Sequence, residues 1–428
     1  MSQLTISLAA KPHGSLTSEQ VASALSQACP ADNYRNRRVL LIVPDATRTA
    51  PVGLLFKTLH QQLGGVTKSL DVLIALGTHQ PMSEEAICQR LEITLDERRG
   101  RYAKVAFHNH AWDDPTHLRQ VGTLTADEIS QLTGGLFSME VPVEVNKLVF
   151  DYDQIIIIGP VFPHEVVGFS GGNKYLFPGI AGPRILNFFH WLGAVVTNPM
   201  IIGNKWTAVR KVVDKAGALV TVPKLCFCMV VEGSDLAGLY AGTPETAWDA
   251  ASELSRKLHI TYKDHPFKTI LSCAPTMYDE LWTGGKCMYK LEPVLADGGE
   301  LIIYAPHIHE VCVTHGKTIM EIGYHCRDYF LQQWDKFKGY PWGVLAHSTH
   351  VRGIGTYENG VEKCRAQVTL ATGIPEDVCR KINLGYRDPK SIRKEDFANR
   401  EDEGVLLVPK AGEMLYHLKK QPKWAGGA

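Results

Sequence analysis

One segment of the chain, PHEVVGFSGGNKYLFPGIAGPRILNFFHWLG, places a lysine on a glycine-rich loop between two histidines. The three residues are Lys174, His164 and His190. Histidine titrates near neutral pH and can act as a base or bind a metal. Glycines let a backbone approach a ligand closely, and a lysine on such a loop can clamp an anion or attach a cofactor covalently. The segment therefore predicts ligand binding. The alternative is that the lysine has no functional role and is exposed on a flexible turn.

The loop around Lys174 is not one of the common nucleotide-binding motifs. A P-loop reads GxxxxGK[ST]. Here Gly168 stands six residues before Lys174, but Asn173 fills the second glycine position and Tyr175 follows the lysine. The loop does not follow GxGxxG either. ATP or GTP hydrolysis and dinucleotide binding are therefore disfavoured.

Other polar residues come directly after apolar, β-branched runs. Asp45, Thr47 and Arg48 follow RVLLIV, His79 follows LDVLIAL, and His164 follows QIIIIGPVF. In parallel α/β sheets, ligands bind beyond the carboxyl ends of the strands. This shared location predicts an enzyme site in which the arginine and threonine suit a phosphate or carboxylate. For PDATRTAP alone, a helix N-cap with a surface ion pair is an equally good interpretation.

Two further segments carry candidate residues on predicted helices. PRILNFFHWLG predicts a helix from Pro183 to Gly193, in which His190 is partly buried. That histidine is either a hydrogen-bonded core residue or a metal ligand. YDELWTGGKCMYK predicts the start of another helix, with Thr283 and Lys286 on one face. This lysine either contacts a carboxylate across a cleft or is solvated.

The segment FHNHAWDD has a weaker pattern of possible metal ligands. It contains His108, His110, Asp113 and Asp114. A His-x-His pair with nearby carboxylates is a weak metal signal. A polar loop that closes over a site is at least as good an interpretation.

The apolar runs predict an α/β fold in two domains. Continuous rather than alternating hydrophobicity indicates strands that are buried on both faces of parallel sheets. The predicted strands lie in the ranges 38–48, 70–81, 154–165, 268–275, 299–306 and 342–350. Helical patterns lie between them, as in PVGLLFKTLHQQL and TPETAWDAASELSRKL. The predicted domains are 1–262 and 266–404, and the segment 405–428 is expected to pack back on the first.

Composition limits the possible partners and compartment. Lys and Arg number 45, as do Asp and Glu, so no overall charge favours nucleic acid or an anionic membrane. We find neither a long apolar run typical of a membrane span nor a signal-peptide pattern, and we expect a cytoplasmic protein. The ten cysteines are scattered, which favours free thiols over disulfides or a zinc site.

Taken together, these motifs resemble the nickel-dependent lactate racemase family. The matching features are PDATRTAP, GTHQP, HEVVGFSGGNK, FPGIAGPRILNFFH and DELWTGGK, in the family's order. The resemblance runs from Pro44 to about Lys286 and is densest from His164 to His190. The remaining C-terminal third resembles the family in strand pattern only.

The resemblance implies two α/β domains with the active site in the cleft between them. It also implies a nickel pincer nucleotide, a pyridinium mononucleotide whose two sulfur groups and ring carbon hold nickel. Lys174 would be its covalent tether, His190 its fourth nickel ligand, and His79 and His164 the catalytic histidines. Further contacts to the nucleotide or the substrate anion would come from Asp45, Ala46, Thr47, Arg48, Thr283 and Lys286. The implied partners are a small 2-hydroxy acid and the proteins that make the cofactor, not nucleic acid or membrane.

The chemistry of a 2-hydroxy acid agrees with this resemblance. Its α-hydrogen is a poor acid, because loss of that proton would give a dianion. Loss of a hydride, with transfer of the hydroxyl proton to a base, gives a planar 2-keto acid instead. Two bases on opposite faces make this step reversible, and each needs a pKa near neutrality, as histidine has. The cofactor would supply the hydride acceptor.

Two departures from the family pattern put lactate itself in doubt. Gln80 stands where the lactate enzyme has arginine, and Thr283 stands where it has glutamine. The second domain also carries many hydrogen-bonding side chains: His307, His309, His315, His347, Ser348, Thr349, His350 and Arg352. Buried polar groups need partners, so these residues favour a polyhydroxylated substrate. We expect racemisation or C2 epimerisation of a 2-hydroxy acid larger than lactate, with an aldonic sugar acid as the first choice.

Two other classes of function remain open. One is an NAD-dependent dehydrogenase or a phosphate-handling enzyme that uses the glycine loop without nickel. The other is a non-catalytic protein that carries the cofactor or binds a sugar acid. A carrier needs Lys174 and His190 but has no use for two opposed bases, so His79 and His164 favour the enzyme.

Overall fold

A computed structural model of the protein describes residues 5–47 and 49–420. The chain divides into two compact units. The first comprises the described residues of Met1–Phe162, Phe169–Leu186 and Ala208–Leu258. The second comprises those of Pro163–Gly168, Asn187–Thr207 and His259–Ala428. Both units are α/β, as the sequence predicts.

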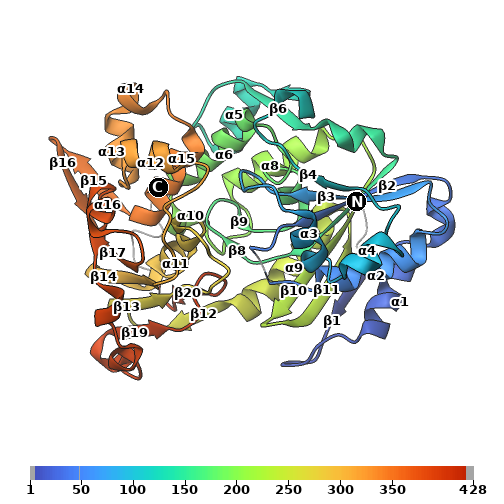
Figure 1. Ribbon diagram of the computed structural model, residues 1–428. Helices are drawn as coiled ribbons and strands as arrows, with labels where there is room; N and C mark the ends of the chain where they lie inside the picture. The colour runs from blue at the N-terminus through green and yellow to red at the C-terminus, as the bar shows by residue number, and fades with distance from the viewer. Residues whose placement is uncertain (1–4, 48, 421–428) are drawn as a thin grey trace. The chain divides into compact units, whose positions relative to one another are not determined.

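The main sheet of the first unit is mostly parallel (Figure 1). Its spatial order is β1-β11-β10-β7-β2-β3-β4. The strands are β1 (Ile6–Ala9), β2 (Arg38–Pro44), β3 (Ser69–Ala75), β4 (Phe107–Asn109), β7 (Gln154–Pro160), β10 (Lys224–Glu232) and β11 (Asp235–Gly242). β10, β7, β2, β3 and β4 run parallel, whereas β11 is antiparallel to both β1 and β10. The strand order reverses direction between β2 and β7, which makes their carboxyl ends a topological switch point.

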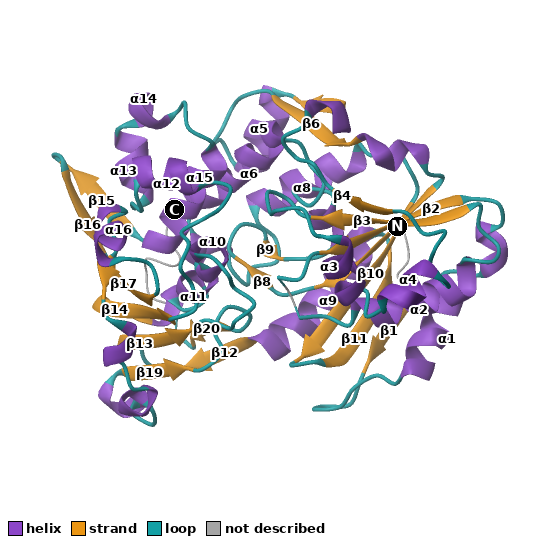
Figure 2. Cartoon of the chain, viewed as in Figure 1, coloured by secondary structure: helices purple, strands orange, loops and turns teal. Residues whose placement is uncertain are grey.

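The first sheet is buried on both faces because its strands are apolar at successive positions. Val39, Leu41 and Val43 belong to a core that also contains residues of two helices, α1 (Ser18–Ala28) and α2 (Val52–Leu63). Leu40 and Ile42 point to the opposite face and are also fully buried. Figure 2 shows helices around the strands of this sheet.

The other elements of the first unit connect or cover these strands. Its remaining helices are α3 (Glu84–Arg90), α4 (Leu95–Arg99), α5 (Ala126–Thr133), α8 (Ala208–Ala218) and α9 (Pro244–His259). An antiparallel pair is formed by β5 (Leu118–Leu124) and β6 (Val141–Asn146). The helix α6 (Pro183–Val196) begins in the first unit and ends in the second. Two short strands, β8 (Pro163–His164) and β9 (Gly168–Phe169), follow β7 along the chain.

The main sheet of the second unit is parallel throughout, with the order β18-β17-β14-β13-β19. Its strands are β13 (Phe267–Cys273), β14 (Leu295–Ala305), β17 (Gln367–Thr372), β18 (Gly385–Tyr386) and β19 (Val405–Val408). β14, β17 and β18 succeed one another on one side of β13, and β19 adds on the other. The switch point of this sheet therefore lies between β13 and β19.

Shorter elements surround the second sheet. The helices are α7 (Asn198–Ile201), α10 (Leu281–Gly284), α11 (Lys286–Tyr289), α12 (Gly316–Ile322), α13 (Arg327–Gln332), α14 (Trp334–Phe337), α15 (Trp342–Arg352) and α16 (Glu376–Lys381). Two further strand pairs are β12 (Ile260–Lys263) with β20 (Leu415–Leu418), and β15 (Gly355–Glu358) with β16 (Val361–Cys364). Within the described residues, no helix is both long and apolar enough to cross a membrane.

Five of the six predicted strands are present, and one prediction is wrong. The range 342–350 forms the helix α15 instead of a strand. Residues Val344–Val351 of this helix are all buried. The helix therefore has no exposed polar face, and its sequence lacks the amphipathic pattern by which a helix is usually predicted. A short buried run cannot be assigned to helix or strand by hydrophobicity alone. The preceding Pro341, with φ −59°, stands at the N-cap.

Two predicted helices also differ from the structure. The helix α6 starts at Pro183 as predicted but continues beyond Gly193 to Val196. A Cβ at Gly193 would lie 3.2 Å from Val166, so this glycine allows close packing rather than ending the helix. The predicted second helix is two single turns, α10 and α11, because Gly285 between them packs against α15.

The predicted domain limits of 1–262 and 266–404 differ from the compact units as well. Segments 163–168 and 187–207 belong to the second unit, although they lie within the predicted first domain. Asn198 explains part of this assignment, because its amide donates to Tyr289 O and Glu292 Oε2, both at 2.9 Å. The segment 405–428 was expected to pack on the first domain, but β19 pairs with β13 in the second sheet.

Candidate functional site

The first unit gathers predicted site residues at the switch point of its sheet. Asp45 directly follows β2, His79 follows β3, and Lys174 lies in the turn that comes after β7 and β9. The backbone amide of Gly77 donates to Gly179 O at 2.9 Å, which ties the loop after β3 to the loop after Lys174. These three strand exits therefore lie at one edge of the sheet. The sequence predicted Asp45 and His79 there together with His164, which belongs to the second unit.

Asp45 and His79 form an ion pair. Asp45 Oδ2 lies 2.5 Å from His79 Nδ1, and the other carboxylate oxygen accepts the backbone N–H and hydroxyl of Thr47 at 3.0 and 2.7 Å. Burial by itself raises the pKa of Asp45, but the His79 ring and the Thr47 donors outweigh it and hold that pKa well below its ordinary value. An ionised Asp45 fixes the Nδ1 proton of His79 and leaves Nε2 to act on a substrate.

Arg90, which the sequence analysis did not single out, holds the loop that carries Asp45. Its guanidinium donates to Pro44 O at 3.2 Å and to Ala50 O at 3.3 Å, one at each end of PDATRTAP. Its buried Nη2 has no hydrogen-bond partner among the described residues. Ala46 is exposed in the same loop. Arg48, a predicted contact to the cofactor or substrate, lies outside the described residues.

The loop before Lys174 is shaped by two glycines. Gly171 and Gly172 have φ of +93° and +60°, a region that favours glycine. A Cβ at Gly172 would lie 2.7 Å from Pro244 O, and one at Gly171 would lie 2.6 Å from Val161. The glycines are therefore needed both for conformation and for close packing. Lys174 itself is half-buried.

Buried polar side chains anchor this loop from behind. Asn173 is fully buried, and its amide donates to Asp214 at 3.1 Å and to Glu245 at 2.6 Å. The fully buried Arg210 donates to Gly171 O at 3.4 Å and stacks over Trp248, 4.0 Å from the ring centroid. Asn173, which stands at the position of the second glycine of a P-loop, therefore anchors this loop to the rest of the unit.

The second unit holds His164 in a defined orientation. The fully buried Lys290 donates to the backbone carbonyls of Pro163 and of Glu413, the latter at 3.2 Å, and so fixes the strand β8. His164 is buried, and its Nδ1 accepts the backbone N–H of Val166 at 3.1 Å. The Glu165 carboxylate lies 3.4 Å from the same nitrogen. A neutral His164 that accepts from Val166 carries its proton on Nε2.

His190 belongs to a region of the second unit that contains further histidines. The ring of Trp282 stacks on His347 with centroids 4.0 Å apart and contacts His315 at 4.7 Å. Burial lowers the pKa of His347 well below its usual range, with added effects of His350, His315 and His190. Burial likewise lowers the pKa of His350 to about 4. His347 and His350 are therefore neutral at physiological pH.

Thr283 and Lys286 lie in the adjoining helical turns and are both buried. The Thr283 hydroxyl donates to Glu280 O at 3.0 Å, so part of its hydrogen-bonding capacity is used within its own turn. The Lys286 ammonium lies 4.7 Å from the ring centroid of Tyr278. Both residues follow the carboxyl end of β13, where ligands bind in parallel sheets.

His110 has a structural role rather than a metal-binding one. It is buried, donates through Nε2 to Ala181 O at 3.0 Å and accepts the Asn146 amide at 3.1 Å. Burial lowers its pKa to about 4. Asp114 instead pairs with His117 at 2.8 Å.

Other predicted donors in the second unit are used within the protein. Ser348 donates to Gly323 O at 2.9 Å, Thr349 to Ala346 O at 2.8 Å and Arg352 to Ala366 O at 3.1 Å. His307 donates to Tyr278 O at 3.0 Å. By contrast, the buried Nε2 of His350 has no hydrogen-bond partner among the described residues.

The residues present fit the nickel pincer nucleotide that the resemblance implies. A shaped glycine loop presents Lys174, and the cluster around His347 places neutral imidazoles near His190. Within the described ranges, no group of three or more His, Cys, Asp or Glu side chains could hold a metal ion. A single imidazole ligand suits a metal whose other ligands come with the cofactor.

The structure thus brings the predicted residues together in two sets, one in each unit. The first contains Asp45, Thr47, His79 and Lys174, and the second contains His164, His190, Thr283 and Lys286. The sequence analysis missed the residues that support them: Arg90, Asn173, Arg210, Trp282 and Lys290. Arg90 and Lys290 act on backbone carbonyls, and the local sequence gives no signal for such contacts. Trp282 stands within DELWTGGK and could have been noted there.

Known lactate racemases are similar to this chain in the region that contains several of these residues. The model of the lactate racemase N-terminal domain matches residues 15–200, a range that includes both His79 and His190. The lactate racemase of Thermoanaerobacterium thermosaccharolyticum is 28% identical over 157 residues, which span 35% of this chain and 31% of that protein. The lactate racemase of Lactiplantibacillus plantarum is 22% identical over 316 residues, 70% of this chain and 69% of that protein.

Solved structures share the fold over nearly the whole chain. A Thermotoga maritima protein has a TM-score of 0.88 and 37% identity, and covers 96% of this chain and 100% of its own. The lactate racemase apoprotein from T. thermosaccharolyticum has a TM-score of 0.66 and 16% identity, and covers 95% of this chain and 90% of its own. The chain is a homologue of the lactate racemases, and its residues 15–200 match the N-terminal domain of that family.

Proposed function

We propose that the protein is an isomerase that inverts the hydroxyl-bearing carbon 2 of a 2-hydroxy acid. The observation that carries this proposal is the Asp45–His79 pair at the switch point of the first sheet. An ionised carboxylate on Nδ1 orients the ring and stabilises its protonated form, as a general base requires. A protein that merely stored a cofactor would have no use for this pair. Homology to lactate racemases supports the same class of activity.

His79 and His164 would act on the substrate hydroxyl in opposite senses. Asp45 holds the proton on Nδ1 of His79, so its Nε2 can accept the hydroxyl proton. To return a proton to the other enantiomer, His164 would act as the imidazolium, with Nε2–H toward the substrate and its charge balanced by the Glu165 carboxylate 3.4 Å from Nδ1, so that a neutral imidazole remains. For the reverse reaction, that neutral imidazole keeps its proton on Nδ1 beside Glu165 and accepts the hydroxyl proton at Nε2.

Lys174 and His190 would hold the nickel pincer nucleotide, the first as covalent tether and the second as metal ligand. When bound, this cofactor would supply the acceptor for the α-hydrogen as hydride. The chain's own residues would orient the substrate and move the hydroxyl proton. Lys286, buried in the second unit, would pair with the substrate carboxylate. The proposal requires that both sets of side chains reach one substrate, as in a cleft between the domains.

An aldonic sugar acid is the substrate class that we favour. A polyhydroxylated chain offers hydroxyl groups to neutral imidazoles, and burial keeps His347 and His350 neutral in this region. The unpartnered Nε2 of His350 supports a polar ligand, because a buried polar atom without a partner costs about 1–3 kcal/mol. The methyl group of lactate would leave such atoms unsatisfied.

The test is intact mass of the full chain, produced together with the proteins that make the pincer nucleotide. We expect an adduct that peptide mapping places on Lys174, absent in Lys174→Ala and present in Lys211→Ala, an exposed lysine of α8. The loaded protein should then interconvert the C2 epimers of a six-carbon aldonic acid faster than the enantiomers of lactate. Chiral chromatography measures both reactions.

The possible results separate the alternatives. An unmodified Lys174, in a preparation that loads a known lactate racemase, would exclude the tether and leave the loop as an anion site. An adduct without isomerisation of any 2-hydroxy acid would indicate a carrier. An adduct with faster lactate turnover would keep the enzyme class and remove the sugar acid.

A further inference from the structure

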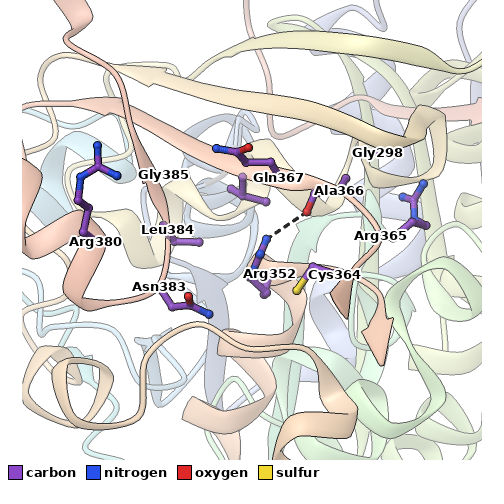
Figure 3. A pocket seen from close by; sticks show the side chains of 11 residues that line it. Gly298, Arg352, Cys364, Arg365, Ala366, Gln367, Arg380, Asn383, Leu384 and Gly385 are labelled. Atoms are coloured by element: carbon purple, nitrogen blue, oxygen red, sulfur yellow. Dashed lines mark hydrogen bonds between the residues drawn. The ribbon is translucent and has the colours of Figure 1, made fainter. Parts of the chain in front are cut away.

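The second unit contains a cavity that the proposed reaction does not use. It has a volume of about 520 Å³ and lies at the amino ends of β17 and β18 (Figure 3). Its polar lining consists of Arg352, Arg365, Arg380, Gln367, Asn383 and the thiol of Cys364. The volume falls within the range of about 300–1,000 Å³ that is usual for small-molecule sites.

The cavity is distinct from the candidate active-site residues of the same unit. Thr283 and Lys286 follow the carboxyl end of β13, and β17 is parallel to β13 through β14. The cavity lies at the opposite end of these strands. Six residues of β17 span roughly 20 Å at about 3.3 Å per residue, so one molecule of ordinary metabolite size does not fill both sites.

The charge of the lining is strongly positive, because it contains three guanidinium groups and no carboxylate. Two of the arginines have carboxylate partners at the rim. Arg380 pairs with Glu376 at 2.6 Å, but both side chains are more than half exposed, and such pairs contribute little. Arg365 is largely committed, since it donates to Glu292 O at 2.8 Å and to Asp297 at 3.3 Å.

Arg352 is the residue of the cavity that most clearly indicates a ligand. Its Nη1 donates to Ala366 O at 3.1 Å, the contact drawn in Figure 3, and its buried Nε has no partner among the described residues. It also forms no ion pair with any residue in the described ranges. Arg352 stands in the last turn of α15, where a cation offsets the helix dipole. That effect explains a positive charge but not a cavity lined with two further arginines and two amides.

We infer that this cavity binds a small molecule that carries a phosphate group. Planar guanidinium forks recognise phosphate oxygens through paired N–H donors, and Arg352 of α15 and Arg380 of α16 supply such forks to the cavity lining. The Asn383 amide N–H groups already donate to Tyr324 O and Glu362, so the Asn383 carbonyl and the Gln367 amide remain to bond the rest of the molecule. The volume leaves room for more than an inorganic ion, so the site suits a sugar phosphate or a similar monoester.

Cys364 provides a direct way to observe binding. It lines the cavity, and it is the one cysteine of the ten that is not buried. A hydrogen bond from the Cys326 thiol lowers the pKa of Cys364, and the nearby Arg352 adds to this effect against the opposing effect of burial. Thiolates react with alkylating reagents and thiols do not. Cys364 should therefore react first, and a bound anion should block it sterically and electrostatically.

The experiment measures the rate of alkylation of Cys364 by N-ethylmaleimide in the full chain, by intact mass and peptide mapping. Glucose 6-phosphate and inorganic phosphate are the two phosphate probes, with citrate and sodium chloride at equal ionic strength for comparison. Glucose 6-phosphate at ten times its Kd should slow the reaction about tenfold, because about one molecule in eleven remains unoccupied. Cys364→Ser identifies the reacting thiol.

Matched arginine variants make the test specific. Arg352→Gln should abolish protection, and Arg380→Gln, which changes a more exposed side chain, should weaken it without a risk to folding. Arg393→Gln is the control, because Arg393 also forms an exposed ion pair in this unit but lies outside the cavity. Protection by sodium chloride alone would overturn the inference. So would protection by glucose 6-phosphate that is as strong in Arg352→Gln and Arg380→Gln as in the wild type.

The remaining outcomes also decide the question. Protection by citrate but by neither phosphate probe would contradict the phosphate class. Protection by inorganic phosphate with equal affinity to glucose 6-phosphate would place the free ion, rather than a monoester, in the site. The measurement needs neither cofactor nor turnover, so its result does not depend on whether the proposed function is correct.

Discussion

The two sets of candidate residues use titratable groups in opposite ways. Around Lys174 the charges are kept and paired: Asp45 is ionised against His79, and Arg210 is buried against Trp248 and backbone carbonyls. Around His190 the imidazoles of His347 and His350 are neutral, because burial lowers the pKa of both. The first region is built to hold charge in place, whereas the second is built to offer uncharged donors and acceptors.

This difference corresponds to the two tasks that the proposed reaction needs. A base must hold a fixed orientation and tolerate protonation, which an ionised partner provides. Recognition of hydroxyl groups needs donors and acceptors without a strong field, which neutral imidazoles provide. Changing one group at a time in each region tests whether the two regions differ in this way.

The largest expected effect is loss of the two proposed bases. His79→Gln and His164→Gln should each lower kcat by a factor on the order of 10²–10⁴, the usual range for a general acid or base. The Lys174 adduct should remain in both variants. Turnover of a sugar acid by the loaded protein is the measurement, and His117→Gln, an exposed histidine of the first unit, is the control. Equal activity in either variant would remove that residue from the mechanism.

The next largest effect is acid sensitivity in the second region. Burial lowers the pKa of His350 to about 4, against about 6.5 in an unfolded chain. The unfolded state therefore takes up a proton at a higher pH than the folded state, and stability falls as pH drops from 6.5 to 4. This single group accounts for a loss of about 3 kcal/mol over that interval. His350→Gln should make the free energy of unfolding less dependent on pH there.

Urea denaturation at pH 7, 5.5 and 4 measures this dependence. His265→Gln is the control in the same unit, because that histidine is exposed. The variant's stability at pH 7 can differ from the wild type without affecting the argument, which concerns the slope with pH. A slope unchanged in His350→Gln would mean that this imidazole is not held neutral by the fold.

A smaller effect is expected for the partner of His79. Asp45→Asn keeps the shape of the side chain but removes the charge that stabilises protonated His79. We expect kcat to fall on the order of tenfold to hundredfold, less than for loss of the base itself, with little change in KM. A fall in activity explained by a lower yield of Lys174 adduct would instead indicate a purely structural role.

Much of this arrangement could be predicted from the sequence. Asp45, His79 and His164 were placed at strand ends because apolar runs precede them, and parallel sheets put such ends on one edge. The continuous hydrophobicity of Gln154–Pro160 and Phe267–Cys273 also predicted strands correctly. These inferences needed only local pattern and general sheet geometry.

What could not be predicted depends on contacts between distant segments. Helix α15 was taken for a strand because its burial comes from packing on all sides, which removes the periodicity that marks a helix. The roles of Arg90 and Lys290 depend on carbonyls 40–127 positions away in the chain. The assignment of 187–207 to the second unit depends partly on the single side chain of Asn198.

The smallest effects are expected from two helix glycines that support the two regions. A Cβ at Gly217 in α8 would lie 2.6 Å from the amide of Asn173, which is buried and hydrogen-bonded and cannot easily move. Gly217→Ala should destabilise the protein by about 1–3 kcal/mol, the usual cost of overpacking. A Cβ at Gly193 would lie 3.2 Å from Val166, so Gly193→Ala should stay within about 1 kcal/mol, partly offset by the gain in helix propensity.

Denaturation of both variants, together with the yield of Lys174 adduct, compares the tolerance of the two regions. Gly217→Ala should lower the adduct yield, because a displaced Asn173 loosens the loop that presents the lysine. Gly193→Ala should leave the yield unchanged and affect turnover only slightly, through the backbone next to His164. If the two alanines prove equally costly, the lysine loop is not the more tightly constrained region, and the contrast between a charge-holding and a recognising region loses its structural basis.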